Sequence, residues 1–287
     1  MLENFLSMFT YPFMIRALVV GTLVSLCAAL LGVSLVLKRY SMIGDGLSHV
    51  GFGALAVAAV CHAAPLAVAI PVVVLSAFFL LRLSENSKIK GDAAIAVIST
   101  SALAMGVLVL SLGDGVNTDI YNYMFGSIYA MSGEDVVLSI VLSLIVLVLF
   151  VLLYHRIFAV TFDEAFARAA GLRAGMYNMI IAALTAVTIV LGMRMMGAML
   201  ISALIIFPAH TSMRLFKTFR QVVISSAAVA VVCFFLGITV SYLFDLPGGA
   251  SVVLINLAAM LLFSLLSMIR RGKQQKKGSP AGDPKTL

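Results

Sequence analysis

Residues 39–55 have the sequence RYSMIGDGLSHVGFGAL and lie between two long apolar runs, the second of which they begin. Asp45 and His49 are four residues apart, so a helix places both side chains on one face, one turn apart. Ser48 lies beside them. A carboxylate and an imidazole that enter a bilayer are costly unless they are paired, hydrated or bound to a ligand. We therefore predict that Asp45 and His49 form the functional centre, with Ser48 as a lesser candidate.

A simpler interpretation of the same pair is that Asp45 caps the helix and His49 is a hydrogen-bonded packing residue. The spacing alone favours neither interpretation and does not name a metal. The stretch is also rich in glycine, which keeps a helix thin and lets another backbone approach closely. The glycines are Gly44, Gly46, Gly51 and Gly53.

The composition defines the class of protein. Of the 287 residues, 62% are hydrophobic and 11% are charged, and the mean hydropathy is +1.14. This balance predicts an all-α polytopic membrane protein, because lipid requires every backbone group to be satisfied internally. We expect one transmembrane domain over residues 1–270 and no cleavable signal, since the first apolar run is too long for one. Residues 271–287 are expected to form a basic, disordered cytoplasmic tail able to contact anionic lipid.

Hydropathy predicts eight to nine transmembrane helices. The apolar segments cover residues 14–37, 46–63, 65–81, 93–112, 136–153, 175–193, 197–213, 221–244 and 249–269. The seventh segment is short and contains Pro208, so we expect it to be broken or re-entrant. Residues 121–131 are too short to span a bilayer and are expected to dip into it or lie along it.

Charge asymmetry predicts the orientation. With the N-terminus outside and the C-terminus inside, 17 of the 19 Lys and Arg residues lie in inside loops or the tail, and Arg16 and Arg194 are the exceptions. This is the bias of the positive-inside rule, and it argues against nucleic acid as a partner. The outside loops carry acidic residues that attract cations, namely Glu3, Asp114, Asp119, Glu134, Asp135 and Asp245.

Sulfur-containing side chains are interpreted as packing residues. Three cysteines lie far apart and form no disulfide or zinc-ribbon pattern, at Cys27, Cys61 and Cys233. Methionines cluster at Met193, Met195, Met196 and Met199. Thioethers suit soft metals, but methionine commonly fills the interfaces between helices, and we favour that interpretation.

The largest inside loop, residues 154–174, contains a predicted amphipathic helix. Asp163 and Glu164 favour its first turn, and Gly171 is a suitable C-cap. One side is apolar and consists of Ala165, Phe166, Ala169 and Ala170. Such a helix can dock into a groove of a partner protein, or it can rest on lipid headgroups.

Two further polar residues are candidates for the path of a ligand or its gate. Asp92 begins the fourth apolar segment, either as an N-cap or as a ligand or gate residue. His210 follows Pro208, whose missing N–H leaves a carbonyl free. His210 is therefore either a ligand or a partner of that carbonyl.

Six motifs in order resemble the zinc/manganese-type ABC importer permeases and together cover most of the chain. They are GDGLSH (44–49), KGDAAI (90–95), MFGSIYAM (124–131), FDEAFARAAGL (162–172), GAMLISALIIFPA (197–209) and LPGGASVVL (246–254). Two positions depart from the family pattern. Gly46 stands where Ala is usual, and His210 stands where an apolar or small residue is more common, which could alter metal preference.

The resemblance implies the permease fold of the cobalamin and siderophore importers, with two copies forming a path between them. It implies transient binding of transported Zn²⁺ or Mn²⁺ at Asp45 and His49, without a permanently bound cofactor. It also implies a prokaryotic cytoplasmic membrane and an extracytoplasmic metal-binding protein as donor. A separate ATP-binding cassette ATPase would dock on the loop, at candidate residues Asp163, Glu164, Phe166, Ala169, Gly171 and Leu172.

The chain contains no phosphate-binding Gly-x-x-x-x-Gly-Lys-[Ser/Thr] loop, so it is not expected to hydrolyse ATP. Two rival functions are an ion-coupled secondary carrier that uses Asp45 and Asp92, and an intramembrane metalloenzyme. A carrier function would leave the 162–172 segment without a purpose. A metalloenzyme function is disfavoured because the chain lacks a His-Glu-x-x-His motif.

Overall fold

The computed structural model describes residues 8–86, 91–112, 126 and 133–278, and the secondary-structure elements in this part of the chain are all α-helices. The helices are α2 (Pro12–Leu37), α3 (Ser41–Val60), α4 (Pro65–Asn86), α5 (Gly91–Leu112), α7 (Gly133–Leu152), α8 (Tyr154–Phe162), α9 (Glu164–Ala169), α10 (Ala174–Met196), α11 (Ala198–Leu215), α12 (Phe219–Phe244) and α13 (Gly248–Gly278). The predicted segment 121–131 lies outside the described residues, except for Gly126.

Within the described residues, eight helices are long and apolar enough to cross a membrane, and α11 forms a shorter ninth. This result agrees with the predicted count of eight to nine. The expectation that Pro208 breaks the seventh segment is wrong, because α11 continues past it from Ala198 to Leu215. Transmembrane helices tolerate proline where neighbouring helices surround the freed backbone groups. The chain reverses instead at Gly197, whose φ of 87° lies in the left-handed region.

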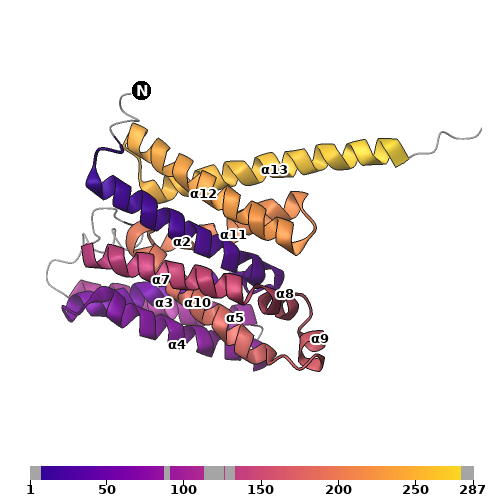
Figure 1. Cartoon of the computed structure of the whole chain (residues 1–287). Coiled ribbons are helices and arrows are strands. Elements are labelled where there is room, and N and C mark those ends of the chain that lie inside the picture. Colours follow the sequence, from indigo (N-terminus) through magenta and orange to yellow (C-terminus); the bar gives the residue numbers. More distant parts are fainter. Residues whose placement is uncertain (1–7, 87–90, 113–125, 127–132, 279–287) are drawn as a thin grey trace, which may run out of the picture.

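The helices form two groups around a shared centre. Figure 1 shows α12 and α13 on one side of α2, and α3, α4, α5 and α10 on its other side, beyond α7. Helix α11 contacts α2, α3, α10, α12 and α13, so it joins both groups. The short helices α8 and α9 lie beyond one end of the spans (Figure 1).

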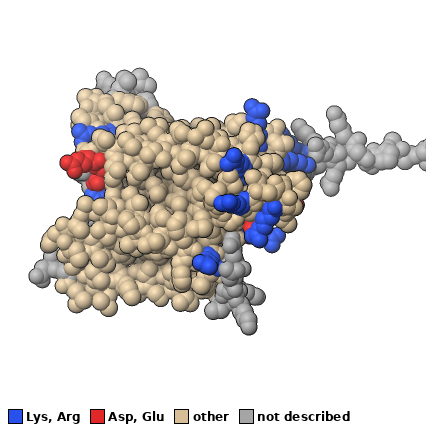
Figure 2. Space-filling model, turned by 60° about the horizontal axis from the view of Figure 1, so that its bottom comes forward, with Lys and Arg blue, Asp and Glu red and all other residues tan. Residues whose placement is uncertain are grey.

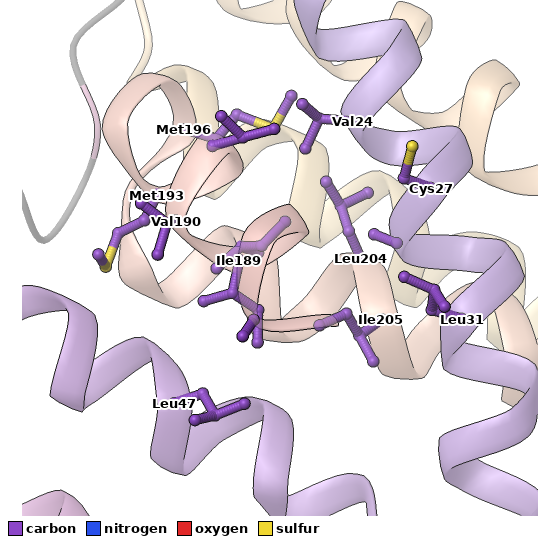
Figure 3. Packing of buried hydrophobic residues seen from close by; sticks show 14 of the residues in the cluster. Val24, Cys27, Leu31, Leu47, Ile189, Val190, Met193, Met196, Leu204 and Ile205 are labelled. Atoms are coloured by element: carbon purple, nitrogen blue, oxygen red, sulfur yellow. The ribbon is translucent and has the colours of Figure 1, made fainter. Parts of the chain in front are cut away.

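The core forms where α2, α3, α10 and α11 converge, and Figure 3 shows their apolar side chains directed toward one another. Met193, Met195 and Met196 are at most 3% exposed, which confirms the packing interpretation for these three methionines. Cys27 and Cys233 are buried as expected, but Cys61 is exposed at the end of α3. The interpretation of Cys61 as a packing residue is therefore wrong. Cys61 is the C-cap of α3, where the chain leaves the packed bundle.

The glycines of α3 allow the close approach that the sequence predicted. A Cβ atom on Gly53 would lie 2.8 Å from the carbonyl oxygen of Ala102 in α5. Helix α3 can therefore pack against the backbone of α5 only where it lacks a side chain. Gly32 of α2 lies against the backbone of Ile205 in α11 in the same way.

Charge is distributed unequally between the two ends of the molecule. Figure 2 shows Lys and Arg gathered at the end from which the C-terminal segment emerges, and acidic residues at the opposite end. Arg194, an exception to the charge bias, donates a 2.8 Å hydrogen bond to Asp135, and both side chains are at most 15% exposed. The other exception, Arg16, is exposed. Helix α13 extends to Gly278, so the boundary expected at residue 270 lies within a helix.

Replacing Gly53 with alanine is expected to loosen α3 from α5. The new Cβ would overlap the Ala102 carbonyl, and overpacking of this kind costs about 1–3 kcal/mol. Gly175→Ala is the matched control, because no atom lies within 4 Å of the position that its Cβ would occupy. We expect a lower midpoint of thermal unfolding in detergent for Gly53→Ala only. Equal midpoints for the two variants would contradict this close contact.

Candidate functional site

Asp45 and His49 lie on one face of α3, as the spacing predicted. His49 Nε2 is 3.6 Å from Asp45 Oδ2, which is an ion-pair distance but too long for a good hydrogen bond. The side chains are 44% exposed for Asp45 and 29% exposed for His49. The pair therefore lies at a surface of the single chain and not within its core.

The alternative interpretation of Asp45 as a helix cap is wrong. The N-cap residue of α3 is Tyr40, and Asp45 is the fifth residue of the helix. Its carboxylate is therefore beyond the first turn, where the free N–H groups of a helix are found. A polar side chain at this depth needs another purpose.

The histidine is also not a satisfied packing residue. Its Nδ1 atom is buried and has no hydrogen-bond partner among the described residues. Most buried polar atoms in proteins have a partner, so an unpaired one calls for an explanation. Neutral imidazole nitrogens are common metal ligands, and such a role would satisfy this atom.

Ser48 connects the pair to α11. Its hydroxyl donates a 2.7 Å hydrogen bond to the carbonyl of Asp45, and its Oγ lies 3.2 Å from Oγ of Ser202. The Ser202 hydroxyl also lies 3.3 Å from the carbonyl oxygen of Ala198 in its own helix. Ser202 was not singled out from the sequence, although it lies within the 197–209 motif, because nothing in the sequence aligns α11 with α3.

The other two candidate ligands are not joined to the pair in the described structure. His210 is exposed on α11, two turns beyond Ser202, and hydrogen-bonds to no other described residue. Of the two interpretations of His210, the bond to the carbonyl freed by Pro208 is therefore not observed among the described residues, and its role as a ligand stays a prediction. Asp92 is the second residue of α5, and its side chain lies outside the described part of the chain.

No group of three or more His, Cys, Asp or Glu residues that could hold a metal occurs among the described residues. Asp45 and His49 supply two ligand side chains, whereas closed zinc sites have four ligands. The described residues of one copy therefore do not form a closed zinc site. An open, incomplete site suits a cation that must be released again.

The predicted loop helix forms as α9 and has both of its expected caps. Asp163 is the N-cap and accepts a 2.9 Å hydrogen bond from the N–H of Phe166. Gly171 follows the helix with a φ of 84°, and Leu172 N–H donates to the carbonyl of Ala167. This is the Schellman arrangement that closes a helix C-terminus.

Helix α9 turns an apolar face outward. Phe166 is 70% exposed and Phe162, just before the helix, is 64% exposed. Ala165, Ala169 and Ala170 are exposed as well, while Ala167 is fully buried against the bundle. Aromatic side chains held outward on a capped, packed helix provide a ready contact surface for another protein.

Glu164 points the other way, toward the membrane helices. Its Oε2 atom lies 3.2 Å from Nζ of Lys38 in the turn after α2, and accepts a 3.1 Å hydrogen bond from Nδ2 of Asn178 in α10. Partial burial acts to raise the pKa of Glu164, but its bonds to Asn178, Arg168 and Lys38 together hold that pKa below its ordinary value. The carboxylate is thus engaged within the chain, which argues against the prediction that Glu164 itself contacts a partner.

A model of the ABC 3 transport family matches residues 10–268. The chain belongs to the ABC 3 transport family. Among relatives in this family, it is 27% identical over 277 residues to the manganese transport system membrane protein MntC of Halalkalibacterium halodurans, covering 94% of this chain and 95% of the relative. It is 28% identical over 261 residues to the high-affinity zinc uptake system membrane protein ZnuB of Haemophilus influenzae, covering 91% and 98%.

A solved structure of PsaBC from Streptococcus pneumoniae in complex with a Fab has the same fold. The TM-score is 0.83 at 26% identity, and the match covers 92% of this chain and 95% of that chain. The resemblance identified from the sequence and the expected all-α permease fold are therefore confirmed for this ABC 3 family protein.

A disulfide between introduced cysteines tests the contact of α3 with α11. The 3.2 Å separation of Ser48 Oγ and Ser202 Oγ is close enough for a disulfide to form with little movement. We expect Ser48→Cys/Ser202→Cys, with the native cysteines replaced by serine, to show no free thiol when it is mildly oxidised, denatured and then treated with maleimide. The control Ser48→Cys/Ser212→Cys places the second thiol about 15 Å further along α11 and should keep both. Equal labelling of the two variants would contradict the contact.

Proposed function

We propose that this chain is the membrane subunit of an ATP-driven importer of divalent metal ions, with Zn²⁺ or Mn²⁺ as its cargo. One observation carries the proposal. In a chain of the ABC 3 transport family, a carboxylate and an imidazole lie together on a half-exposed helix face, and one imidazole nitrogen is buried without a partner among the described residues.

The ligand types suit this cargo. Imidazole nitrogen and carboxylate oxygen bind borderline and hard divalent ions, whereas the softest ions prefer thiolate ligands. The described cysteines are free and lie outside the pair. A transport site must bind strongly enough to replace water and weakly enough to release the ion, so two side chains from each copy are appropriate.

A second copy of the chain would complete the site. Asp45 and His49 share their helix face with Met42 and Val60, whose side chains are 45% and 37% exposed. Between the pair and Val60 this face is covered by α5 at Gly53, so only its two ends are open. A partner chain packed against it would cover the apolar residues and add a second carboxylate and imidazole. The pairs from both copies would then face one conduit.

The remaining partners follow from the two ends of the molecule. An ATP-binding cassette ATPase would bind the outward aromatic face of α9 from the cytoplasm. An extracytoplasmic binding protein would deliver metal at the acidic end. The charge bias supports a location in the prokaryotic cytoplasmic membrane, with the N-terminus outside.

An ion-coupled carrier is the alternative function, but it gives no purpose to a docking helix capped at both ends. An intramembrane metalloenzyme would need more clustered ligands than the described residues provide.

Removing either ligand is expected to stop metal accumulation. Asp45→Asn and His49→Gln keep the size of each side chain but remove the charge or the imidazole donor. We expect uptake of Zn²⁺ and Mn²⁺ in competition to fall by at least about tenfold, the lower range seen when metal-site groups are lost. His62→Gln at the opposite end of α3 is the matched control and should retain uptake. Normal uptake in both pair variants, with normal expression, would refute the assignment.

The orientation can be tested with a native residue. Cys61 is exposed at the end of α3 that lies opposite to α9, while Cys27 and Cys233 are buried. We expect a membrane-impermeant maleimide to label the wild-type protein in intact cells and not the Cys61→Ser variant. Arg168→Cys in the Cys61→Ser background places a thiol on α9 and should be labelled only after permeabilisation. The reverse pattern would show that the C-terminus is outside.

A further inference from the structure

A cluster of polar side chains fastens α9 to the membrane helices. The "anchor" consists of Lys38, Glu164 and Asn178. Lys38 Nζ lies 3.2 Å from Glu164 Oε2 and donates a hydrogen bond to Oδ1 of Asn178, while Asn178 Nδ2 donates to the same Glu164 oxygen at 3.1 Å. Each of the three residues thus contacts the other two, and they come from α2, α9 and α10.

The anchor is built as a buried site. The Lys38 side chain is only 8% exposed, Asn178 is 3% exposed, and Glu164 is 29% exposed. Lys38 also lies over the ring of Tyr40, with Nζ 5.9 Å from the ring centre. A buried ammonium group is costly without compensation, so Glu164 is the counter-charge that allows Lys38 to remain in place. Arg168, which also bonds to Glu164, is 63% exposed and lies on the outer side of the cluster.

Helix α9 does not depend on the anchor for its own formation. Its ends are capped by Asp163 and by the Gly171 turn, and Ala167 packs into a separate small cluster with Val160, Ala174 and Tyr177. The apolar face that carries Phe166 points away from the anchor residues. The surface that meets a partner and the contacts that reach the membrane helices are therefore made by different side chains of one short helix.

The anchor lies close to the metal pair along the chain. Lys38 is the C-cap of α2, Arg39 adopts a left-handed φ of 62°, and Tyr40 is the N-cap of α3. Tyr40 N–H donates to the carbonyl of Leu35 at 2.8 Å, so the turn is closed by backbone hydrogen bonds. Asp45 follows within the first two turns of α3.

Asn178, the third member of the anchor, is connected along the chain to α11, the second helix beside Asp45 and His49. Asn178 lies in the first two turns of α10, which ends at Met196 and continues through Gly197 into α11. Ser202 of α11 contacts Ser48, whose hydroxyl bonds to the carbonyl of Asp45. A displacement of α9 therefore reaches both helices that border the metal pair, through one ion pair and one amide.

We propose that the anchor is the link by which movement of the ATPase, received at α9, is passed to α3 and α11. This inference rests on the proposed function. Lys38, Glu164 and Asn178 are positioning residues: they touch neither metal nor nucleotide. Neutralising the Lys38–Glu164 ion pair should leave the ATPase bound but should uncouple ATP hydrolysis from metal transport. Loss of the aromatic surface of α9 should instead prevent the ATPase from binding.

The test uses the complex with its ATP-binding cassette subunit, reconstituted in liposomes, and measures retained ATPase and Mn²⁺ moved per ATP hydrolysed. For Glu164→Gln and for Lys38→Met we expect normal retention and a transport ratio reduced on the order of tenfold, a common size for coupling between sites. The double variant should be no worse than either single variant, because both remove one interaction. Lys38→Arg, which keeps the charge, should restore most of the ratio. Arg168→Gln is the control for the exposed end of the cluster and should change the ratio less than about twofold.

The outcomes separate the anchor from the docking surface. Phe166→Ala should lose the ATPase, and full retention in that variant, or no metal movement by the wild-type complex, would refute the proposed function. If the wild-type complex transports and Phe166→Ala loses the ATPase, but Glu164→Gln keeps a normal ratio, the anchor is refuted alone. Loss of the ATPase in Glu164→Gln would also overturn it, since Glu164 would then be a docking contact. Failure of Lys38→Arg to improve on Lys38→Met would show that the ion pair is not responsible.

Discussion

Polar side chains among membrane helices must find partners, and this requirement explains two ion pairs that join separate helices of the described bundle. Arg194 pairs with Asp135 at one end, and Lys38 pairs with Glu164 at the other. Both pairs join different helices, so each fixes the relative position of two helices. Asp45 and His49 differ, because they lie on a single helix, are partly exposed and leave Nδ1 of His49 unpaired among the described residues. The proposed binding of a passing cation would supply a partner for that nitrogen.

The surroundings of Asp45 and His49 are determined by how α3 packs against its neighbours. The glycines of α3 bring it against α5 on one side, as at Gly53, and Ser48 joins it to α11 through Ser202. The remaining face carries the pair together with exposed apolar residues. Helix α3 thus combines close packing against its own chain with a partly exposed site at Asp45 and His49. The anchor extends this arrangement to the surface helix α9, so the Asp45–His49 pair and the exposed aromatic face of α9 belong to one connected set of helices.

Much of this arrangement could be predicted from the sequence, because it depends on local patterns. Apolar length gave the spans, a four-residue spacing placed Asp45 beside His49, and local cap signals gave the ends of α9. The features that could not be predicted depend on contacts between distant segments. Glu164 lies on a surface helix, and only the position of Lys38 and Asn178 shows that it faces inward. The role of Ser202, the continuity of α11 through Pro208 and the exposure of Cys61 likewise depend on neighbours or helix ends that periodicity does not specify.

The central claim is that the cargo ion is held by Asp45 and His49 during transport. Anomalous diffraction from crystals of the complex grown with Mn²⁺ or Zn²⁺ tests it most directly, because it locates the metal itself. The claim predicts an anomalous peak about 2.0–2.2 Å from a carboxylate oxygen of Asp45 and a ring nitrogen of His49, with equivalent ligands from a second copy. A peak elsewhere in the path, with both side chains turned toward lipid, would contradict it.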